Sequence, residues 1–437
     1  MANKLYIKTF GCQMNEYDTE KISEIFHSKN KTVRTNQPEE ADIILFNTCS
    51  VREKAQEKVF SDLGRVKQYK SKNPNLIIGV GGCVASQEGK NILKRAPYVD
   101  LVFGPQTIHR LPKMIEKKLE TKKPQIDLEF PEVEKFDSLP TTQNDGPTAF
   151  ISIMEGCSKY CSFCVVPYTR GTEFSRPVES ILIEINNLVQ AGVKEITLLG
   201  QNVNAYFDEN HKLDFASLLE LISEINDIFR IRFTTSHPKE FTTKLVNSFY
   251  HLPKISNQLH LPVQSGSDKI LTAMKRGYTA IEYKSIIKKV RSYRPNISIT
   301  SDFIVGFPGE TETDFEKTID LIDAIRFDGA FSFTYSDRPG TPASSIVDKI
   351  SEEIKLKRLR KLQNQIKIYA DEYNNNLLDK TQKVLVEGFS KKNINQLMGR
   401  TNCNRVVNFS GKKNIIGKLV NLKITQVLSN SLKGELI

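Results

Sequence analysis

Six of the seven cysteines in this chain fall into two groups of three that are suited to binding a metal. Cys157, Cys161 and Cys164 form a C-x3-C-x2-C run in the segment GCSKYCSFC, so three thiolates can reach one metal assembly from a single loop. Zinc normally takes a fourth protein ligand, and the sequence places no further cysteine or histidine pair at ligand spacing to this loop. A [4Fe-4S] cluster also takes four ligands, so the run predicts such a cluster with one iron open to a ligand from outside the protein.

The second group consists of cysteines that are far apart in the sequence. Cys12, Cys49 and Cys83 each follow a short apolar segment of strand-like composition, namely KLYIKTFG, ADIILFNT and LIIGVGG. In a parallel sheet the carboxyl ends of the strands lie at one edge, where ligands collect, so these three thiols are predicted to meet. The alternative is that they are small buried hydrophobic side chains. A cysteine that serves packing would usually lie inside a strand and not at its end.

The order of strand and helix patterns predicts an α/β protein of three domains. Alternating strands and helices predict a parallel domain of Rossmann or flavodoxin type over residues 1–119. The polar, proline-bearing segment 120–146 has the composition of a linker. Six further strand–helix units predict a partial (β/α)6 barrel over residues 147–375. Short β-like runs separated by turn residues predict a small OB-like β-barrel over residues 376–437.

The charge of the chain is concentrated in its last segment. The formal net charge is +11, and residues 376–437 contribute +8, from eleven Lys or Arg against three acidic residues. A small basic β-barrel is typical of RNA-binding modules. No stretch has the ~18 apolar residues of a membrane span, and the N-terminal residues lack the pattern of a signal peptide. We therefore expect a cytoplasmic protein without membrane contact, where clustered cysteines favour metal or redox chemistry over disulfides.

The segment GCSKYCSFC, after a strand at the start of a β/α series, resembles the cluster loop of radical S-adenosylmethionine enzymes. The resemblance implies a [4Fe-4S] cluster on Cys157, Cys161 and Cys164, with S-adenosyl-L-methionine on its open iron. An electron from such a cluster cleaves the sulfonium to a 5′-deoxyadenosyl radical, which abstracts hydrogen from an unreactive carbon. Arg170 and Arg176 follow this loop in PYTRGTEFSRP and are further candidates for a role at the site, with surface ion pairing as the alternative.

The same resemblance implies residues that contact S-adenosylmethionine. The family places a backbone contact to the adenine after the fifth barrel strand, which corresponds here to Gly306, Gly309 and Glu310 in IVGFPGETETDF. Gln264 and Ser265, in LPVQSGS, end the fourth strand and are expected at the ribose or the methionyl part of the cofactor. Turn formation and helix capping are the alternative roles for all of these residues.

The three domains in this order resemble the radical S-adenosylmethionine methylthiotransferases. In that family a second [4Fe-4S] cluster is bound by N-terminal cysteines, here Cys12, Cys49 and Cys83, and the C-terminal module resembles the TRAM domain. The segments YIKTFGCQMNEYD and GCSKYCSFCVVPYTRG imply the members that convert N6-isopentenyladenosine at tRNA position 37 to its 2-methylthio derivative. Alternatives are methylthiolation of N6-threonylcarbamoyladenosine in tRNA or of a ribosomal protein. A metal-stabilised RNA-binding protein is the alternative outside enzymes.

The implied reaction also implies partners. A C2–H bond on adenine has no useful acidity, so a polar acid–base mechanism cannot replace it, and a radical is needed. The expected partners are the anticodon arm of tRNA, held mainly through its phosphates, and an electron donor such as flavodoxin or ferredoxin. The protein is expected to be a monomer. The candidate phosphate contacts in the basic C-terminal domain are Lys391, Lys392, Arg400, Arg405, Lys412 and Lys413.

Overall fold

The computed structural model describes residues 3–49, 55–130, 136, 140 and 146–437 of the chain. These residues divide into two compact units. The first unit combines the described part of residues 1–143 with Met154–Ser158 and Val165–Arg176. The second unit combines the described part of residues 144–153 with Lys159–Cys164 and Pro177–Ile437. No helix among the described residues has both the length and the apolar character needed to cross a membrane.

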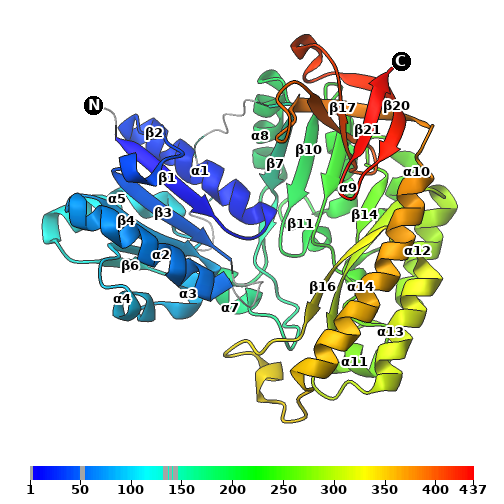
Figure 1. The fold of residues 1–437 in the computed structure, drawn as a ribbon, viewed down its shortest axis with the longest axis horizontal. Coiled ribbons are helices and arrows are strands. Elements are labelled where there is room, and N and C mark those ends of the chain that lie inside the picture. Colours follow the sequence, from blue (N-terminus) through cyan, green and yellow to red (C-terminus); the bar gives the residue numbers. More distant parts are fainter. Residues whose placement is uncertain (1–2, 50–54, 131–135, 137–139, 141–145) are drawn as a thin grey trace. The chain divides into compact units, whose positions relative to one another are not determined.

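The first unit is built on a six-stranded parallel sheet with the strand order β2-β1-β3-β4-β5-β6 (Figure 1). This confirms the parallel α/β fold predicted for this part of the chain. The strands are β1 (Lys4–Thr9), β2 (Val33–Arg34), β3 (Ile43–Thr48), β4 (Ile77–Gly82), β5 (Leu101–Phe103) and β6 (Gln125–Asp127). The helices are α1 (Gln13–Asn30), α2 (Ala55–Lys72), α3 (Cys83–Glu88), α4 (Asn91–Arg95) and α5 (Leu111–Thr121).

Alternate residues of the central strands face opposite layers of helices. Ile43 and Leu45 belong to the core that includes side chains of α1 and α5, whereas Ile44 and Phe46 belong to the core that includes side chains of α2 and α4. Successive side chains of a strand point to opposite faces, so a strand covered on both faces reads as a continuous apolar run. This is why the segment ADIILFNT predicts a buried strand.

The sequence-based prediction does not contain α5 and β6. Strand β6 lies in the segment expected to be a linker, and it pairs in register with β5. The hydroxyl of Thr107 donates to the carbonyl oxygen of Asp127, at the end of β6, at 2.9 Å. A three-residue edge strand whose central Ile126 is exposed has too short a pattern to distinguish it from a linker.

Two short elements around the C-x3-C-x2-C loop also belong to the first unit. Strands β8 (Met154–Glu155) and β9 (Phe174–Ser175) form an antiparallel pair, and α7 (Val166–Arg170) lies between them in the sequence. Helix α7 packs against α3, the helix that begins at Cys83. The segment that follows the cysteine loop is therefore part of the unit that contains Cys12, Cys49 and Cys83.

The second unit contains the six strands predicted for the partial (β/α)6 barrel, which is confirmed. They form two three-stranded parallel sheets, β7-β10-β13 and β14-β15-β16, joined by an isolated parallel bridge between Ile231 and Ile255. The strands are β7 (Thr148–Ser152), β10 (Glu195–Leu199), β13 (Arg230–Phe233), β14 (Gln258–His260), β15 (Ser298–Val305) and β16 (Gly329–Thr334). The accompanying helices are α8 (Val178–Gln190), α9 (Phe215–Ser223), α10 (Thr243–His251), α11 (Asp268–Ala273), α12 (Ala280–Tyr293) and α13 (Glu312–Ile325).

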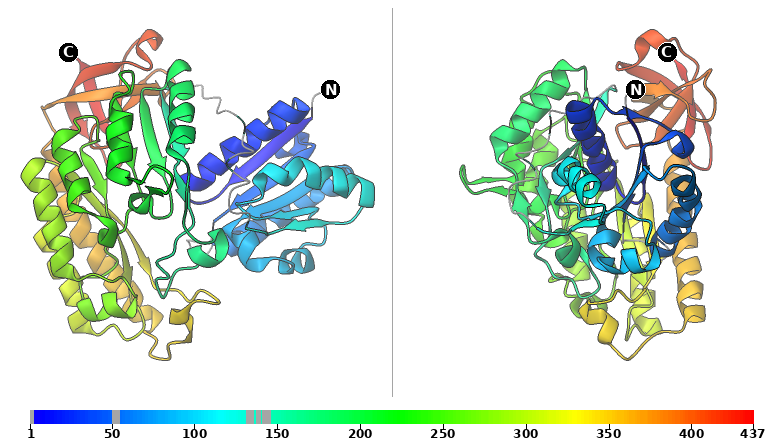
Figure 2. Two further views of the ribbon diagram at one scale, coloured as in Figure 1. Left: turned by 180° about the vertical axis from the view of Figure 1, so that it is seen from behind. Right: turned by 90° about the vertical axis from the view of Figure 1, so that its left-hand side faces the viewer.

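The second unit ends in a long helix and a closed β-barrel. Helix α14 (Glu352–Asn375) runs along the outside of the strands and leads into the barrel, as Figure 2 shows in two views. The barrel has the strand order β17-β18-β19-β21-β20, which confirms the small β-barrel. Its strands are β17 (Thr381–Phe389), β18 (Leu397–Thr401), β19 (Val406–Phe409), β20 (Leu419–Val427) and β21 (Leu432–Leu436), of which β21 was not predicted.

Candidate iron–sulfur and cofactor sites

The three cysteines of the first unit lie at the carboxyl ends of β1, β3 and β4. Thr48, the last residue of β3, pairs with the last residue of β4, so Cys49 and Cys83 are the next residues on two paired strands. Gly11 has a φ of +107°, and a Cβ at this position would lie 2.2 Å from the Cβ of Cys49. Only glycine fits there. This close approach brings Cys12 beside Cys49, as the strand ends predicted.

A buried asparagine holds the ends of β1 and β3 together. Asn15, on α1, donates from its amide to the carbonyl oxygens of Phe10 at 3.0 Å and Thr48 at 2.8 Å. Its side-chain oxygen lies 3.6 Å from the sulfur of Cys12. One side chain thus fixes the backbone on which Cys12 and Cys49 are placed. Sequence reasoning did not single out Asn15, although its position three residues after Cys12 is visible in the segment GCQMNEYD.

The charges around these cysteines favour the thiolate that binds metal. A hydrogen bond with Cys49 and the positive charge of Arg170 outweigh desolvation and lower the pKa of Cys12 from 9.0 to about 6. Burial acts to lower the pKa of Arg170, but the charges of Asp18 and Cys83 raise it well above its ordinary value. The positive charge therefore lies close enough to act on two of the three cysteines.

The donor set of the first unit fits an iron–sulfur cluster. The three thiols come from three neighbouring strand ends. Three thiolates at one edge can hold a four-iron cluster and leave one iron for another ligand. Cys49 and Cys83 are buried while Cys12 is exposed, so the assembly would be reachable from one side.

The C-x3-C-x2-C loop begins at a constrained turn in the first unit. The backbone N–H of Cys157 donates to the carbonyl oxygen of Gly171 at 3.1 Å. Gly156 has a φ of +76°, and a Cβ there would lie 1.8 Å from the carbonyl oxygen of Thr172. A side chain at residue 156 would collide with backbone, so the glycine before Cys157 is a steric requirement of the loop.

The other two cysteines of this loop belong to the second unit. Cys164 donates its N–H to the carbonyl oxygen of Cys161 at 3.0 Å, which places both on one tight turn. The sulfur of Cys161 lies 3.4 Å from one guanidinium nitrogen of Arg276. The other two nitrogens of Arg276 donate to the carbonyl oxygen of Pro262 at 2.9 Å and to the hydroxyl of Tyr278 at 3.0 Å. Sequence reasoning did not identify Arg276, which lies more than a hundred residues away.

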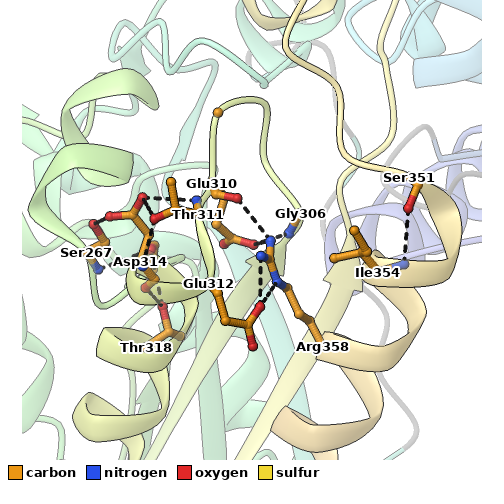
Figure 3. Close-up of polar contacts among 12 residues, drawn as sticks. Ser267, Gly306, Glu310, Thr311, Glu312, Asp314, Thr318, Ser351, Ile354 and Arg358 are labelled. Atoms are coloured by element: carbon orange, nitrogen blue, oxygen red, sulfur yellow. Dashed lines mark hydrogen bonds and ion pairs between the residues drawn. The ribbon is translucent and has the colours of Figure 1, made fainter.

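The loop after β15 contains Gly306 and Gly309, the glycines predicted to contact the adenine of the cofactor; Figure 3 labels Gly306 in this loop. The carboxylate of Glu310 accepts from the N–H of Gly306 at 2.7 Å and from Arg358 at 2.8 Å, and its side chain is 1% exposed. Burial raises the pKa of Glu310, while Gly306 and Arg358 oppose that rise. Gly306 and Gly309 have φ values of +71° and +79°. The N–H of Gly309 donates to the carbonyl oxygen of Asp348 at 2.9 Å, so both glycine N–H groups have partners within the protein, and Glu310 shapes the turn.

The loop after β14 is tied to the first two turns of α13. Gln264 has a φ of +76°, uncommon for a residue with a side chain. The hydroxyl of Ser265 lies 3.3 Å from that of Thr318 and is fully buried. The hydroxyl of Ser267 donates to Asp314 at 2.7 Å, as Figure 3 shows. Ser265 thus holds the loop in place. Gln264 is the residue with the strained backbone after this strand.

The basic residues of the C-terminal barrel fall into two sets. Arg405 forms an ion pair with Asp328, which precedes β16, and donates to the side chain of Asn374 at 2.6 Å. Arg400 forms an ion pair with Glu387 at 3.3 Å. These two arginines make contacts within the protein. The exposed members of the predicted group are Lys391, Lys392, Lys412 and Lys413.

Comparison with known families agrees with these modules. The family model "Uncharacterized protein family UPF0004" matches residues 4–104, the "Radical SAM superfamily" model matches residues 151–322, and the "TRAM domain" model matches residues 378–437. The central match contains the C-x3-C-x2-C loop and the loops after β14 and β15. Fold and site therefore define a radical S-adenosylmethionine enzyme with an additional cysteine domain and a C-terminal TRAM domain.

Relatives that match the whole chain give the family. The tRNA-2-methylthio-N(6)-dimethylallyladenosine synthase of Nitrosospira multiformis is 61% identical over 441 residues, covering 100% of this chain and 93% of the relative. The synthase of the same name from Thiobacillus denitrificans is 58% identical over 437 residues, covering 99% of this chain and 98% of the relative. The chain belongs to the family of tRNA-2-methylthio-N(6)-dimethylallyladenosine synthases.

Solved structures share the fold at low sequence identity. The radical S-adenosylmethionine methyltransferase TsrM from Kitasatospora setae matches with a TM-score of 0.58 and 13% identity, over 79% of this chain and 75% of that one. The cobalamin-dependent S-adenosylmethionine radical enzyme OxsB matches with a TM-score of 0.54 and 14% identity, over 84% of this chain and 56% of that one. At these identities the likeness concerns the fold.

Proposed function

We propose that this protein replaces the C2–H bond of N6-isopentenyladenosine at tRNA position 37 with a methylthio group. The observation that carries the proposal is the convergence of Cys12, Cys49 and Cys83 in a chain that also contains the C-x3-C-x2-C loop. When bound, two [4Fe-4S] clusters and S-adenosyl-L-methionine would supply the radical, the sulfur and the methyl group for this chemistry, with electrons from an external donor. One cluster alone would support radical formation without a separate place for sulfur.

The residues of the chain bind the clusters, contact the cofactor and position its loops. Cys157, Cys161 and Cys164 hold the cluster that receives S-adenosylmethionine, and the N-terminal trio holds the other. Gly306 and Gly309 are the proposed neighbours of the adenine, on a loop whose two turns of positive φ favour glycine. Glu310 and Ser265 keep the two cofactor loops in place through their internal hydrogen bonds. Gln264, after the fourth strand, contacts the ribose or the methionyl part of the cofactor.

The RNA partner is bound by the C-terminal barrel. The four exposed lysines Lys391, Lys392, Lys412 and Lys413 supply the phosphate contacts to the anticodon arm. The target adenosine leaves its stack to reach the reacting groups, as bases do in other enzymes that modify them. In this proposal a flavodoxin or ferredoxin supplies the electrons, the protein acts as a monomer, and the reaction takes place in the cytoplasm.

Iron counting on cysteine variants tests the proposal. After anaerobic reconstitution, the wild-type chain should contain about eight iron atoms, the number in two four-iron clusters. Replacement of Cys12, Cys49 and Cys83 by Ala should leave about four, and so should replacement of Cys157, Cys161 and Cys164. A zinc-stabilised RNA-binding protein would instead bind zinc without the brown iron–sulfur absorption.

The substrate is tested by mass spectrometry of nucleosides from a strain that lacks the gene. The 2-methylthio derivative of N6-isopentenyladenosine should disappear and should return with the wild-type gene but not with either cysteine variant. Unchanged levels would contradict the tRNA proposal. Loss of a methylthio group from threonylcarbamoyladenosine or from a ribosomal protein would assign the same chemistry to one of those substrates.

A further inference from the structure

Arg170 lies in the first unit although it follows the C-x3-C-x2-C loop in the sequence. It is the last residue of α7, six residues after Cys164. The amide of Gln106 donates to its carbonyl oxygen at 3.0 Å, which fixes the end of α7 on the first unit. Helix α7 also packs against α3, whose first residue is Cys83. The backbone therefore presents this arginine side chain to the N-terminal cysteine site.

The guanidinium group of Arg170 is buried and held by polar partners on α1. Its side chain is 3% exposed. One nitrogen donates to Asp18 at 2.9 Å and to the side-chain oxygen of Asn15 at 3.3 Å. The same oxygen of Asn15 lies 3.6 Å from the sulfur of Cys12. A carboxylate oxygen of Glu155 lies 3.8 Å from the other terminal nitrogen. The side-chain oxygen of Asn15 thus contacts both the guanidinium of Arg170 and the sulfur of Cys12, a proposed cluster ligand.

A buried cation at this place has an electrostatic consequence. Two acidic side chains and one amide hold the guanidinium in a site with little solvent. Burial of these charged groups costs desolvation energy. Charges interact strongly where water is excluded. A cluster on three thiolates becomes more negative when it takes up an electron, so a fixed positive charge beside it favours the reduced form. Net charge and hydrogen bonding are among the factors that set such potentials.

We propose that Arg170 is a positioning residue that places a buried positive charge beside the Cys12, Cys49 and Cys83 site and raises the reduction potential of the cluster bound there. This rests on the proposed function, because it requires a cluster at that site. The role goes beyond ligand binding: Arg170 sets how readily the N-terminal cluster accepts an electron, while the three cysteines hold the metal.

The test measures the potential of the N-terminal cluster alone. In a full-length chain with C157A, C161A and C164A, only the N-terminal site can be loaded, and redox titration with dithionite followed by electron paramagnetic resonance reports its one-electron potential. Arg170→Met should lower that potential by about 59 mV or more, which corresponds to a tenfold change in a one-electron equilibrium. Arg170→Lys, which keeps the charge, should restore most of the wild-type value.

Asp18→Asn gives the opposite charge change with little change in shape. It keeps an acceptor for Arg170 and removes one negative charge, so the potential should rise. This variant, together with Arg170→Lys, decides the question if Arg170→Met does not fold. Arg65→Met is the matched control, because Arg65 is an arginine of the same unit whose side chain is 75% exposed. Water and salt screen its charge, so the potential should not change.

The outcomes separate this inference from the proposed function. Failure of the chain with C157A, C161A and C164A to bind iron would overturn both. Normal iron binding with the same potential in Arg170→Met, or in Asp18→Asn where Arg170→Met does not fold, would overturn the role of Arg170 and leave the proposed function intact. Shifts of opposite sign in Arg170→Met and Asp18→Asn would support the electrostatic role, because loss of packing alone would not follow the sign of the charge.

Discussion

At the scale of single residues, the proposed N-terminal cluster site brings thiols and a positive charge together. The strand ends bring Cys12 and Cys49 together, and Asn15 holds the backbone of both strands. The pKa of Cys12 is lowered to about 6 by the hydrogen bond with Cys49 and by the charge of Arg170, against desolvation. Cys12 is therefore largely a thiolate at neutral pH, and little proton release is needed when iron is bound.

The rate of alkylation of the iron-free protein should report this thiolate. Iodoacetamide should modify Cys12 with a midpoint near pH 6, measured by peptide mass spectrometry across a pH series. Cys403 is 5% exposed and should stay unmodified in the folded protein. A midpoint near the ordinary value of 9.0 would contradict the arrangement. Because the folded pKa is depressed, the stability contributed by this group is complete above about pH 9 and is lost as the pH falls through about 6.

At the scale of elements, α14 closes the loop that follows β15. Arg358, on α14, reaches the carboxylate of Glu310 at 2.8 Å and that of Glu312 at 3.0 Å. A Cβ on Gly306 would lie 2.3 Å from the Cγ of Lys355, one turn earlier on the same helix. The helix therefore covers the loop and leaves no room there for another side chain. The shape of the loop after β15, which is proposed to contact the cofactor, therefore depends on a helix outside the strand series.

Arg358→Met should lower the free energy of unfolding by about 3–5 kcal/mol, because it leaves the buried carboxylate of Glu310 without its cationic partner. Urea unfolding monitored by circular dichroism measures the change. The double variant R358M and E310Q should recover most of the loss, since the buried charge is then removed. Arg360→Met is the control on the same helix, and as an exposed position it should change stability by less than about 0.5 kcal/mol. An effect of equal size at both arginines would contradict this account.

Periodicity was sufficient to predict the strands that place the cysteines, but not the contacts that tune them. The apolar runs before Cys49 and Cys83 are buried on both faces, so their pattern is strong. Strand β21, in the segment LKGEL, is interrupted by Gly and Lys, so its pattern is weak. The ion pair between Arg170 and Asp18 joins residues 152 positions apart. Such pairing depends on tertiary packing, for which a single sequence contains no local signal.

At the scale of the whole molecule, the C-terminal barrel is docked, within the second unit, on the end of the strand series where the strands begin. Arg232 on β13 donates to the carbonyl oxygens of Thr401 at 2.8 Å and Asn402 at 3.1 Å. The third guanidinium nitrogen of Arg232, Nε, donates to the buried carboxylate of Glu195, the first residue of β10, at 2.6 Å. The loops proposed to contact S-adenosylmethionine follow the opposite, carboxyl ends of the strands. Strand β15 has eight residues, so the two ends are ~26 Å apart.

Arg232→Met should loosen this docking and lower the free energy of unfolding by about 2–3 kcal/mol, because two carbonyl groups and a carboxylate lose their donor. Limited proteolysis should then release the C-terminal barrel faster than from the wild type. Lys194→Met is the matched control at the same end of the strands: Lys194 pairs at 2.9 Å with Asp227, whose side chain is 63% exposed. Such surface pairs contribute little to stability. Equal cleavage of the two variants would contradict the docking role of Arg232.

The docking at the strand starts has a genetic consequence. A nonsense codon placed just after α14 would leave Glu195, Arg230 and Arg232, which the barrel helps to cover, facing solvent with several of their backbone acceptors missing. Cellular proteases would then degrade the truncated product. It would not persist as a stable enzyme that lacks only its RNA-binding domain. Alleles of that kind should behave as complete losses of the protein.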